Sequence, residues 1–157
     1  EFYPIAFNFC KDYNLTYMGN TDIHGVYNQT YRTDKQYGPM TIVFAHERSA
    51  EGIKEALFAN RSVVKFGDML IGSENNLKAL VKACLPYKIR SIKGNEAIME
   101  INNKSTLSFY MQLNNKTISI LGSSYVEFKI RLDDKIRFTN TFITDNCQLE
   151  IEIAGLK

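Results

Sequence analysis

Hydrophobic and polar residues alternate with a period of two through the second half of the chain. The alternation is clear at Ala97, Met99 and Ile101, and it returns in the segments 107–113, 118–120, 126–132, 136–138 and 149–153. Turn-forming pairs such as Asn114-Asn115 separate these segments. About six or seven short strands with a turn every 8–12 residues or so are typical of an antiparallel β-sandwich. We therefore predict an all-β sandwich over residues 87–157.

The first 86 residues mix the patterns of helices and strands. Helices are predicted to start near Pro4, behind the N-cap residue Ser49 and behind the N-cap residue Ser73, and Pro86 ends the third helix. Strands are predicted at 15–19, 40–45, 63–66 and 69–71, with a tight turn between the last two. Alternating strands and helices are typical of α/β structure.

The composition excludes some classes of function. The 157 residues carry a net charge of +2 without a Lys/Arg cluster, so we expect no nucleic-acid partner. The sequence has no apolar run of the roughly 18 residues that a membrane span needs. Its three cysteines stand far apart, and we expect them to be buried free thiols. The chain begins at Glu1 without a Met, so we expect an upstream part.

The motif Asp22-Ile23-His24 carries the candidate chemistry. It follows the first predicted strand, and residues two apart in an extended segment point to the same side. A carboxylate and a neutral imidazole placed in this way can bind one metal ion. In (β/α) barrels, catalytic residues stand at that end of the strands. Alone, the motif is equally compatible with a turn aspartate and a surface histidine.

The residues around this motif resemble the last part of a PHP domain, that of the polymerase and histidinol phosphatase family. The resemblance lies in the strings GNTDIH (19–24) and GPMTIVFAHERS (38–49), and it continues in GIKEALF (52–58) and LIG (70–72). It covers roughly residues 1–86 and is similar to phosphodiesterase-like members of the Bacteroidota type. It implies the C-terminal portion of a (β/α) PHP barrel over 1–86, followed by an Ig-like sandwich over 87–157, and it suggests an exported or periplasmic protein by analogy.

The resemblance also implies roles for individual residues. Asp22 and His24 match the last pair of metal ligands, for Zn, Mn or Fe, in a family that hydrolyses phosphate esters. Thr21 replaces the usual Ser and is a second-shell donor or a substrate contact, a role also open to Arg48. Arg48 could equally form a surface ion pair with Glu47, which we favour. Gly38 stands where a basic residue is common, and His46 stands where Lys is usual, so His46 is not counted as a ligand.

Two ligands do not hold a catalytic metal cluster, so this fragment is expected to bind no metal and to be inactive alone. Its expected partners are the remainder of its own PHP barrel, a phosphate ester in the full-length form, and a second copy through the exposed barrel fragment. The alternative function is a non-catalytic binding or assembly module in which the Ig-like sandwich mediates interactions. A carbohydrate-binding sandwich is less favoured because no exposed aromatic platform is evident.

Overall fold

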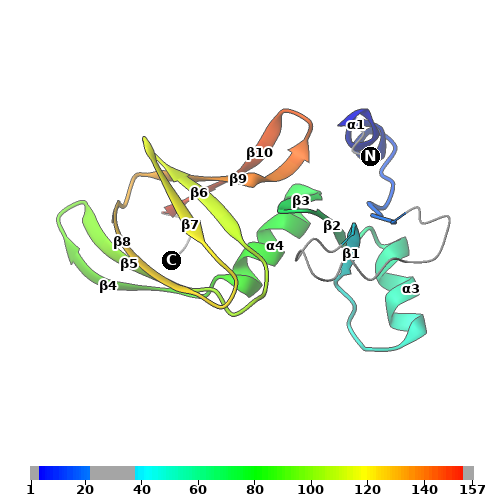
Figure 1. Ribbon diagram of the computed structural model, residues 1–157, viewed down its shortest axis with the longest axis horizontal. Coiled ribbons are helices and arrows are strands. Elements are labelled where there is room, and N and C mark those ends of the chain that lie inside the picture. The colour runs from blue at the N-terminus through cyan, green and yellow to red at the C-terminus, as the bar shows by residue number, and fades with distance from the viewer. Residues whose placement is uncertain (1–3, 22–37, 154–157) are drawn as a thin grey trace. The chain divides into compact units, whose positions relative to one another are not determined.

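The computed structural model describes residues 4–21 and 38–153 (Figure 1). The chain divides into two compact units. The first contains residues up to Leu77 together with Phe142–Cys147, and the second contains Lys78–Thr141 together with residues from Gln148 onward. The first unit thus takes six residues from a distant part of the sequence. The domain boundary at residue 86 stays a prediction.

The first unit combines helices with three antiparallel strands. Its elements are α1 (Pro4–Asp12), β1 (Met40–Val43), α3 (Ala50–Phe58), β2 (Ser62–Phe66) and β3 (Met69–Gly72), and α4 (Glu74–Cys84) follows. The strand order is β1-β2-β3, with Thr41 opposite Val64 and Val64 opposite Ile71. This confirms the predicted helices and the β2–β3 hairpin. The antiparallel pairing differs from the parallel neighbours of a regular (β/α) barrel.

Local sequence explains where these elements begin and turn. The Ser49 hydroxyl accepts a hydrogen bond of 2.9 Å from the Gly52 amide, which satisfies one of the open donors at the start of α3. Gly67 turns the β2–β3 hairpin with a φ of 57°, in the left-handed region that glycine adopts without strain. Both features were anticipated from the sequence.

A small apolar core holds the first unit together. Phe7 of α1, Tyr17 and Ile71 of β3 are buried against one another. Partly buried hydrophobic side chains pack around them, namely Cys10, Val64, Met69 and Phe142. The predicted strand at 15–19 is wrong, because this stretch carries no strand ladder. It reaches the core through Tyr17 and is fastened by side-chain hydrogen bonds instead.

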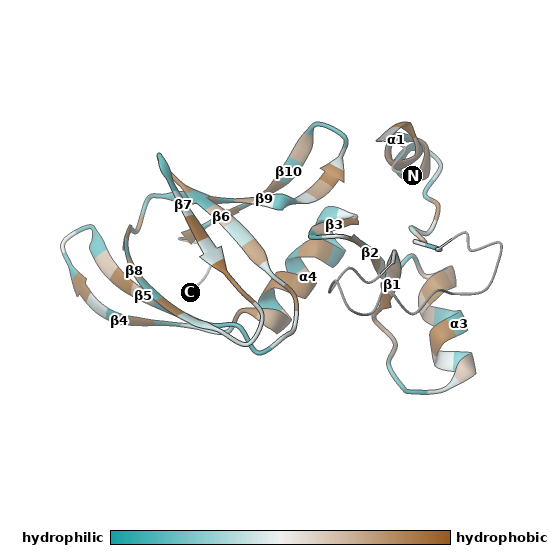
Figure 2. Ribbon diagram, in the orientation of Figure 1, coloured by the Kyte–Doolittle hydropathy of each residue, from teal (hydrophilic) through white to brown (hydrophobic). Residues whose placement is uncertain are grey.

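The second unit consists mainly of antiparallel strands in two sheets. The first has the order β4-β5-β8, with β4 (Tyr87–Lys93), β5 (Glu96–Asn102) and β8 (Tyr125–Arg131). The second contains β6 (Phe109–Leu113), β7 (Lys116–Ile120), β9 (Lys135–Thr144) and β10 (Cys147–Glu152). The strands β5 to β10 confirm the alternating segments, and Figure 2 shows apolar and polar residues interleaved along them. The Ig-like assignment stays a prediction.

The alternating side chains of both sheets form the core of the second unit. Met99 of β5 is opposite Phe128 of β8, and Met99 and Met111 of β6 are almost completely buried. The rings of Phe109 and Phe138 meet edge to face with centroids 6.2 Å apart, an arrangement that aromatic pairs favour. Sheet and helix faces thus bury their apolar sides, as the period of two predicted.

The three cysteines are free, but their exposure differs. Cys84 is buried, Cys10 is half-buried and Cys147 is exposed, so the prediction of buried thiols is wrong for Cys147. Burial raises the pKa of the Cys10 and Cys84 thiols. In the part of the chain that is described, no helix is long and apolar enough to cross a membrane.

Asn103 joins three loop segments of the second unit. Its side chain is almost completely buried, and its amide nitrogen donates to the carbonyl oxygens of Leu107 at 2.7 Å and Leu121 at 2.8 Å. Its amide oxygen accepts from the backbone N–H and the hydroxyl of Ser105. A buried amide with both ends paired is a structural device, because each buried partner needs its hydrogen bond.

Replacing Asn103 by Ala is expected to destabilise the fold strongly. Each buried group left unpaired costs about 1–3 kcal/mol. Urea unfolding followed by circular dichroism measures the loss. The matched control is Asn102→Ala, because the Asn102 side chain is exposed and its backbone amide bonds the carbonyl of Pro86. Equal stability of the two variants would contradict this role of Asn103.

Candidate functional site

The structure describes some of the predicted site residues and not others. Asp22 and His24 lie outside the described residues, so their geometry stays a prediction. Thr21 and Arg48 are described, and both are exposed. The segment that leads into the motif is also described, from the end of α1 to Thr21. The site can therefore be built from the groups that hold this segment.

Hydroxyl groups of β1 and β2 bind the backbone just before the motif. The Thr41 hydroxyl accepts from the Gly19 amide at 3.0 Å and lies 3.3 Å from the Gly19 carbonyl oxygen, to which it donates. The completely buried Ser62 hydroxyl donates to the carbonyl of Tyr17 at 2.6 Å. These bonds fix the extended segment against the hairpin without a strand ladder.

A second set of bonds fastens the start of the same segment to the end of α3. The amide nitrogen of Asn60 donates to the carbonyl of Asn14 at 2.8 Å. The Thr16 hydroxyl donates to the carbonyl of Leu57. Asn14 and Asn60 both have a positive φ, a conformation that Asn tolerates better than most residues. The segment before Thr21 is thus held at both ends.

Close packing leaves no room for a side chain at Gly19. A Cβ atom there would lie 2.6 Å from Cγ1 of Val64 and 3.4 Å from the carbonyl oxygen of Met40. At Gly38, a Cβ atom would lie 3.0 Å from Cγ2 of Thr21. Thr21 and Gly38 are therefore neighbours in space. A larger residue at Gly38 would compete with Thr21 for this place.

The expected ion pair between Glu47 and Arg48 is not formed among the described residues. The Glu47 carboxylate instead accepts a hydrogen bond of 2.6 Å from the Ser49 hydroxyl. Arg48 is exposed and joins no ion pair within the described part of the chain. The surface-pair interpretation of Arg48 is therefore wrong, because Ser49 takes the carboxylate. A substrate contact by Arg48 stays a prediction.

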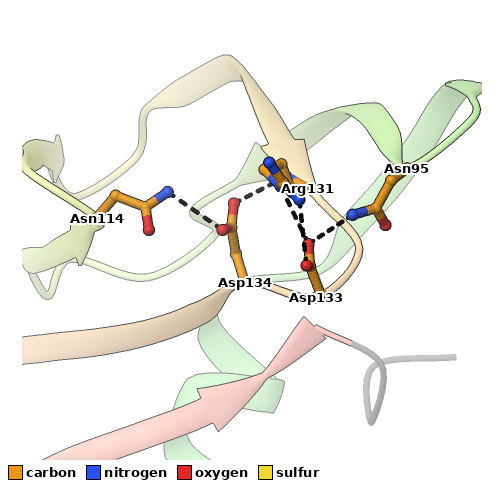
Figure 3. Close-up of polar contacts among 5 residues, drawn as sticks. All are labelled: Asn95, Asn114, Arg131, Asp133 and Asp134. Carbon is orange, nitrogen blue, oxygen red and sulfur yellow. Dashed lines mark hydrogen bonds and ion pairs between the residues drawn. The ribbon is translucent and has the colours of Figure 1, made fainter.

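The Asp133-Asp134 turn is an acidic cluster whose oxygens are already bound (Figure 3). Arg131 contacts both oxygens of Asp133, at 3.2 and 3.3 Å, and Asn95 donates to one of them at 2.7 Å. Asp134 accepts from the Arg131 amide at 2.8 Å and from Asn114 at 3.1 Å. The cluster shapes a turn, and its hydrogen bonds from Arg131 and Asn95 hold the pKa of Asp133 below its usual range.

A buried carboxylate lies on the sheet β4-β5-β8. Glu100 is 6% exposed and forms an ion pair with Arg90 of β4. It also bonds the hydroxyl of Tyr125 on β8, and burial followed by this bond raises the pKa of that tyrosine. Glu100 has an arginine partner and no second acidic group beside it in a metal-binding arrangement. Across residues 4–21 and 38–153, three or more His, Cys, Asp or Glu side chains nowhere gather as a metal site would require.

The second unit also contains a cavity of about 670 Å³. It lies between α4 and the inner faces of the strands, with apolar walls that include Met99, Met111 and Phe138. Lys82 and Glu150 are among its charged residues, and Glu150 is paired with Arg137 at 2.7 Å. A volume of this size is in the range of small-molecule sites.

Comparisons with known proteins connect the chain to one kind of fold. No protein-family model matches the sequence, and no curated protein matches it. Among solved structures, it is similar to a two-domain protein from Bacteroides vulgatus that contains a predicted PHP-like metal-dependent phosphoesterase. The TM-score is 0.83 at 26% sequence identity, and the match covers 94% of this chain and 48% of the neighbour. The chain therefore spans about half the length of this neighbour.

The ion pair of Asp133 makes a prediction about pH. Arg131→Gln is expected to raise the pKa of Asp133 toward its ordinary value, measured by NMR titration of the carboxyl carbon. Because the folded-state pKa is lowered, the pair contributes stability above the ordinary pKa and loses it as the pH falls through the lowered value. Lys129→Gln is the control, since Lys129 is not among the groups that shift this pKa. An unchanged pKa in Arg131→Gln would contradict the assignment.

The Thr41 hydroxyl makes a second prediction, about the segment before the motif. Thr41→Val keeps the shape of the side chain but removes both bonds to Gly19, so we expect faster hydrogen exchange at the Gly19 amide. Thr41→Ser keeps the hydroxyl and is expected to retain protection. Exchange followed by NMR on the 157-residue chain measures the difference. Equal protection in the two variants would show that Thr41 does not anchor the segment.

Proposed function

We propose that this chain is part of a metal-dependent phosphoesterase of the PHP kind. The observation that carries the proposal is the match of 94% of the chain, with a TM-score of 0.83, to a protein that contains a predicted phosphoesterase of this type. The motif Asp22-Ile23-His24 supports it independently, because its side chains have the chemistry of divalent-metal ligands. The reaction is hydrolysis of a phosphate monoester or diester.

Asp22 and His24 supply one carboxylate and one imidazole to the metal site. A bound divalent ion lowers the pKa of its water and polarises the phosphoryl group. The contribution of this chain is to place the two ligands: Thr41 and Ser62 fix the backbone up to Gly19, three residues before Asp22. Thr21, beside Gly38, is positioned as a hydroxyl donor to a ligand or to the substrate.

The fragment alone is proposed to be inactive. Asp22 and His24 are two protein ligands, and a catalytic zinc site typically takes three. The remaining ligands come from the part of the domain that the Bacteroides protein has and this chain lacks. Zn, Mn and Fe all accept carboxylate and imidazole ligands, so the donor set does not choose among them.

One observation favours a second function, that of a non-catalytic binding module. The apolar cavity of the second unit lies entirely among residues of that unit and needs no metal. In this alternative, the strand-rich unit binds a ligand or partner and the first unit has a supporting role. Loss of activity without Asp22 or His24 would separate the two functions.

The two histidines of the chain provide a matched test of the metal ligands. In the full-length protein, His24→Ala and Asp22→Ala are expected to lower hydrolysis of a chromogenic phosphodiester with Mn²⁺ or Zn²⁺ by at least about 100-fold, since even outer-shell changes cost 10–100-fold. His46→Ala removes an exposed histidine and is expected to leave activity unchanged.

Metal content measured by mass spectrometry after dialysis gives the second readout. The wild type and His46→Ala are expected to retain the ion, and the other two variants are expected to lose part of it. Normal activity and normal metal content in both Asp22→Ala and His24→Ala would refute the site.

A further inference from the structure

The helix α1 is apolar on two sides. Phe7 and Cys10 point into the core of the first unit, where they pack with Tyr17 and Ile71. The residues Ile5, Phe9 and Tyr13 recur every four positions, which places them together on another side of the helix. We call these three side chains the outer stripe of α1. Figure 2 shows the helix in the colours of hydrophobic residues.

The outer stripe is exposed to solvent. Ile5 is 82% exposed, Phe9 is 54% exposed and Tyr13 is 67% exposed. The rings of Phe9 and Tyr13 lie with their centroids 4.5 Å apart, so they present one continuous aromatic surface. Large apolar side chains grouped in this way on a surface mark an interaction site, whereas single exposed ones need no explanation.

The segment behind the helix extends this apolar surface along the chain. Leu15 is 45% exposed and Met18 is 56% exposed, and both precede the motif Asp22-Ile23-His24. A surface helix normally has one apolar stripe and one polar face, and a helix that is apolar all round is buried. The first unit covers only one side of α1, so something else must cover the outer stripe.

The comparison with the Bacteroides protein identifies the kind of partner. That protein matches this chain over 48% of its own length, so it contains about as much polypeptide again. The proposed metal site has the same requirement, because its missing ligands must approach the segment that follows α1. A polypeptide that brings these ligands would meet the outer stripe, Leu15 and Met18 on its way.

We propose that the outer stripe of α1 docks the remaining portion of the PHP-like domain, encoded before Glu1 in the same reading frame. This inference rests on the proposed function for the identity of the partner. The contact itself is hydrophobic and does not depend on metal. The outer stripe contains no charged side chain, so burial against an apolar surface requires no compensating ion pair.

The test measures association of two separate polypeptides. The 157-residue chain is mixed with the polypeptide encoded before Glu1, in EDTA, and the complex is followed by multi-angle light scattering and calorimetry. We expect a one-to-one complex whose affinity falls at least about tenfold in Phe9→Asp, as for a central aromatic contact. Phe9→Leu is expected to retain binding.

Matched variants separate docking from loss of the fold. Ile92→Asp introduces the same charge at a residue of β4 that is 60% exposed, and it is expected to leave binding unchanged. Tyr13→Asp is a second variant in the outer stripe, and circular dichroism checks that each variant is folded.

Three outcomes would overturn the proposal: no complex, a complex that Phe9→Asp and Tyr13→Asp leave unchanged, or a dimer of the 157-residue chain formed through the outer stripe in place of the complex. Because no metal is present, the result is independent of the activity test. A complex that hydrolyses no phosphate ester would refute the proposed function and leave the docking surface standing.

Discussion

The hydroxyl of Thr41 bonds both the N–H and the C=O of Gly19, and the first unit depends on this arrangement. One side chain thereby takes the place of a strand ladder, and the buried Ser62 hydroxyl repeats the device at Tyr17. The absence of a side chain at Gly19 allows the approach, because a Cβ atom would collide with Val64. The backbone that enters the proposed metal site is therefore positioned by packing and hydroxyl groups together.

The sequence predicted most of the fold where side-chain periodicity reports burial directly. The strands β5 to β10 alternate because one face of each is buried, and α3 begins at Ser49 because its hydroxyl caps the helix. The strand β4 escaped prediction because six of its seven residues are exposed, which leaves no alternation to detect. The stretch 15–19 was mistaken for a strand because apolar β-formers do not specify which groups bond their backbone.

For the candidate site, the sequence identifies chemistry but not placement. Asp22 and His24 are recognisable as ligand types, while the roles of Thr41 and Ser62 depend on contacts with residues 22 and 45 positions away. A threonine within an apolar run was the available signal for Thr41. The expected pair of Glu47 with Arg48 failed for a local reason, since Ser49 both caps α3 and donates to Glu47. Neighbouring opposite charges do not pair when a hydroxyl offers better geometry.

The insertion of Phe142–Cys147 into the first unit has a consequence for how the protein is made. Phe142 packs with the core around Phe7 and Tyr17, and Asp145 accepts a long hydrogen bond of 3.4 Å from Asn8. During synthesis, α1 emerges from the ribosome first, yet its core lacks Phe142 until most of the chain has been translated. The N-terminal helix must therefore wait with apolar surface uncovered, which makes chaperone contact during translation a natural requirement of this chain order.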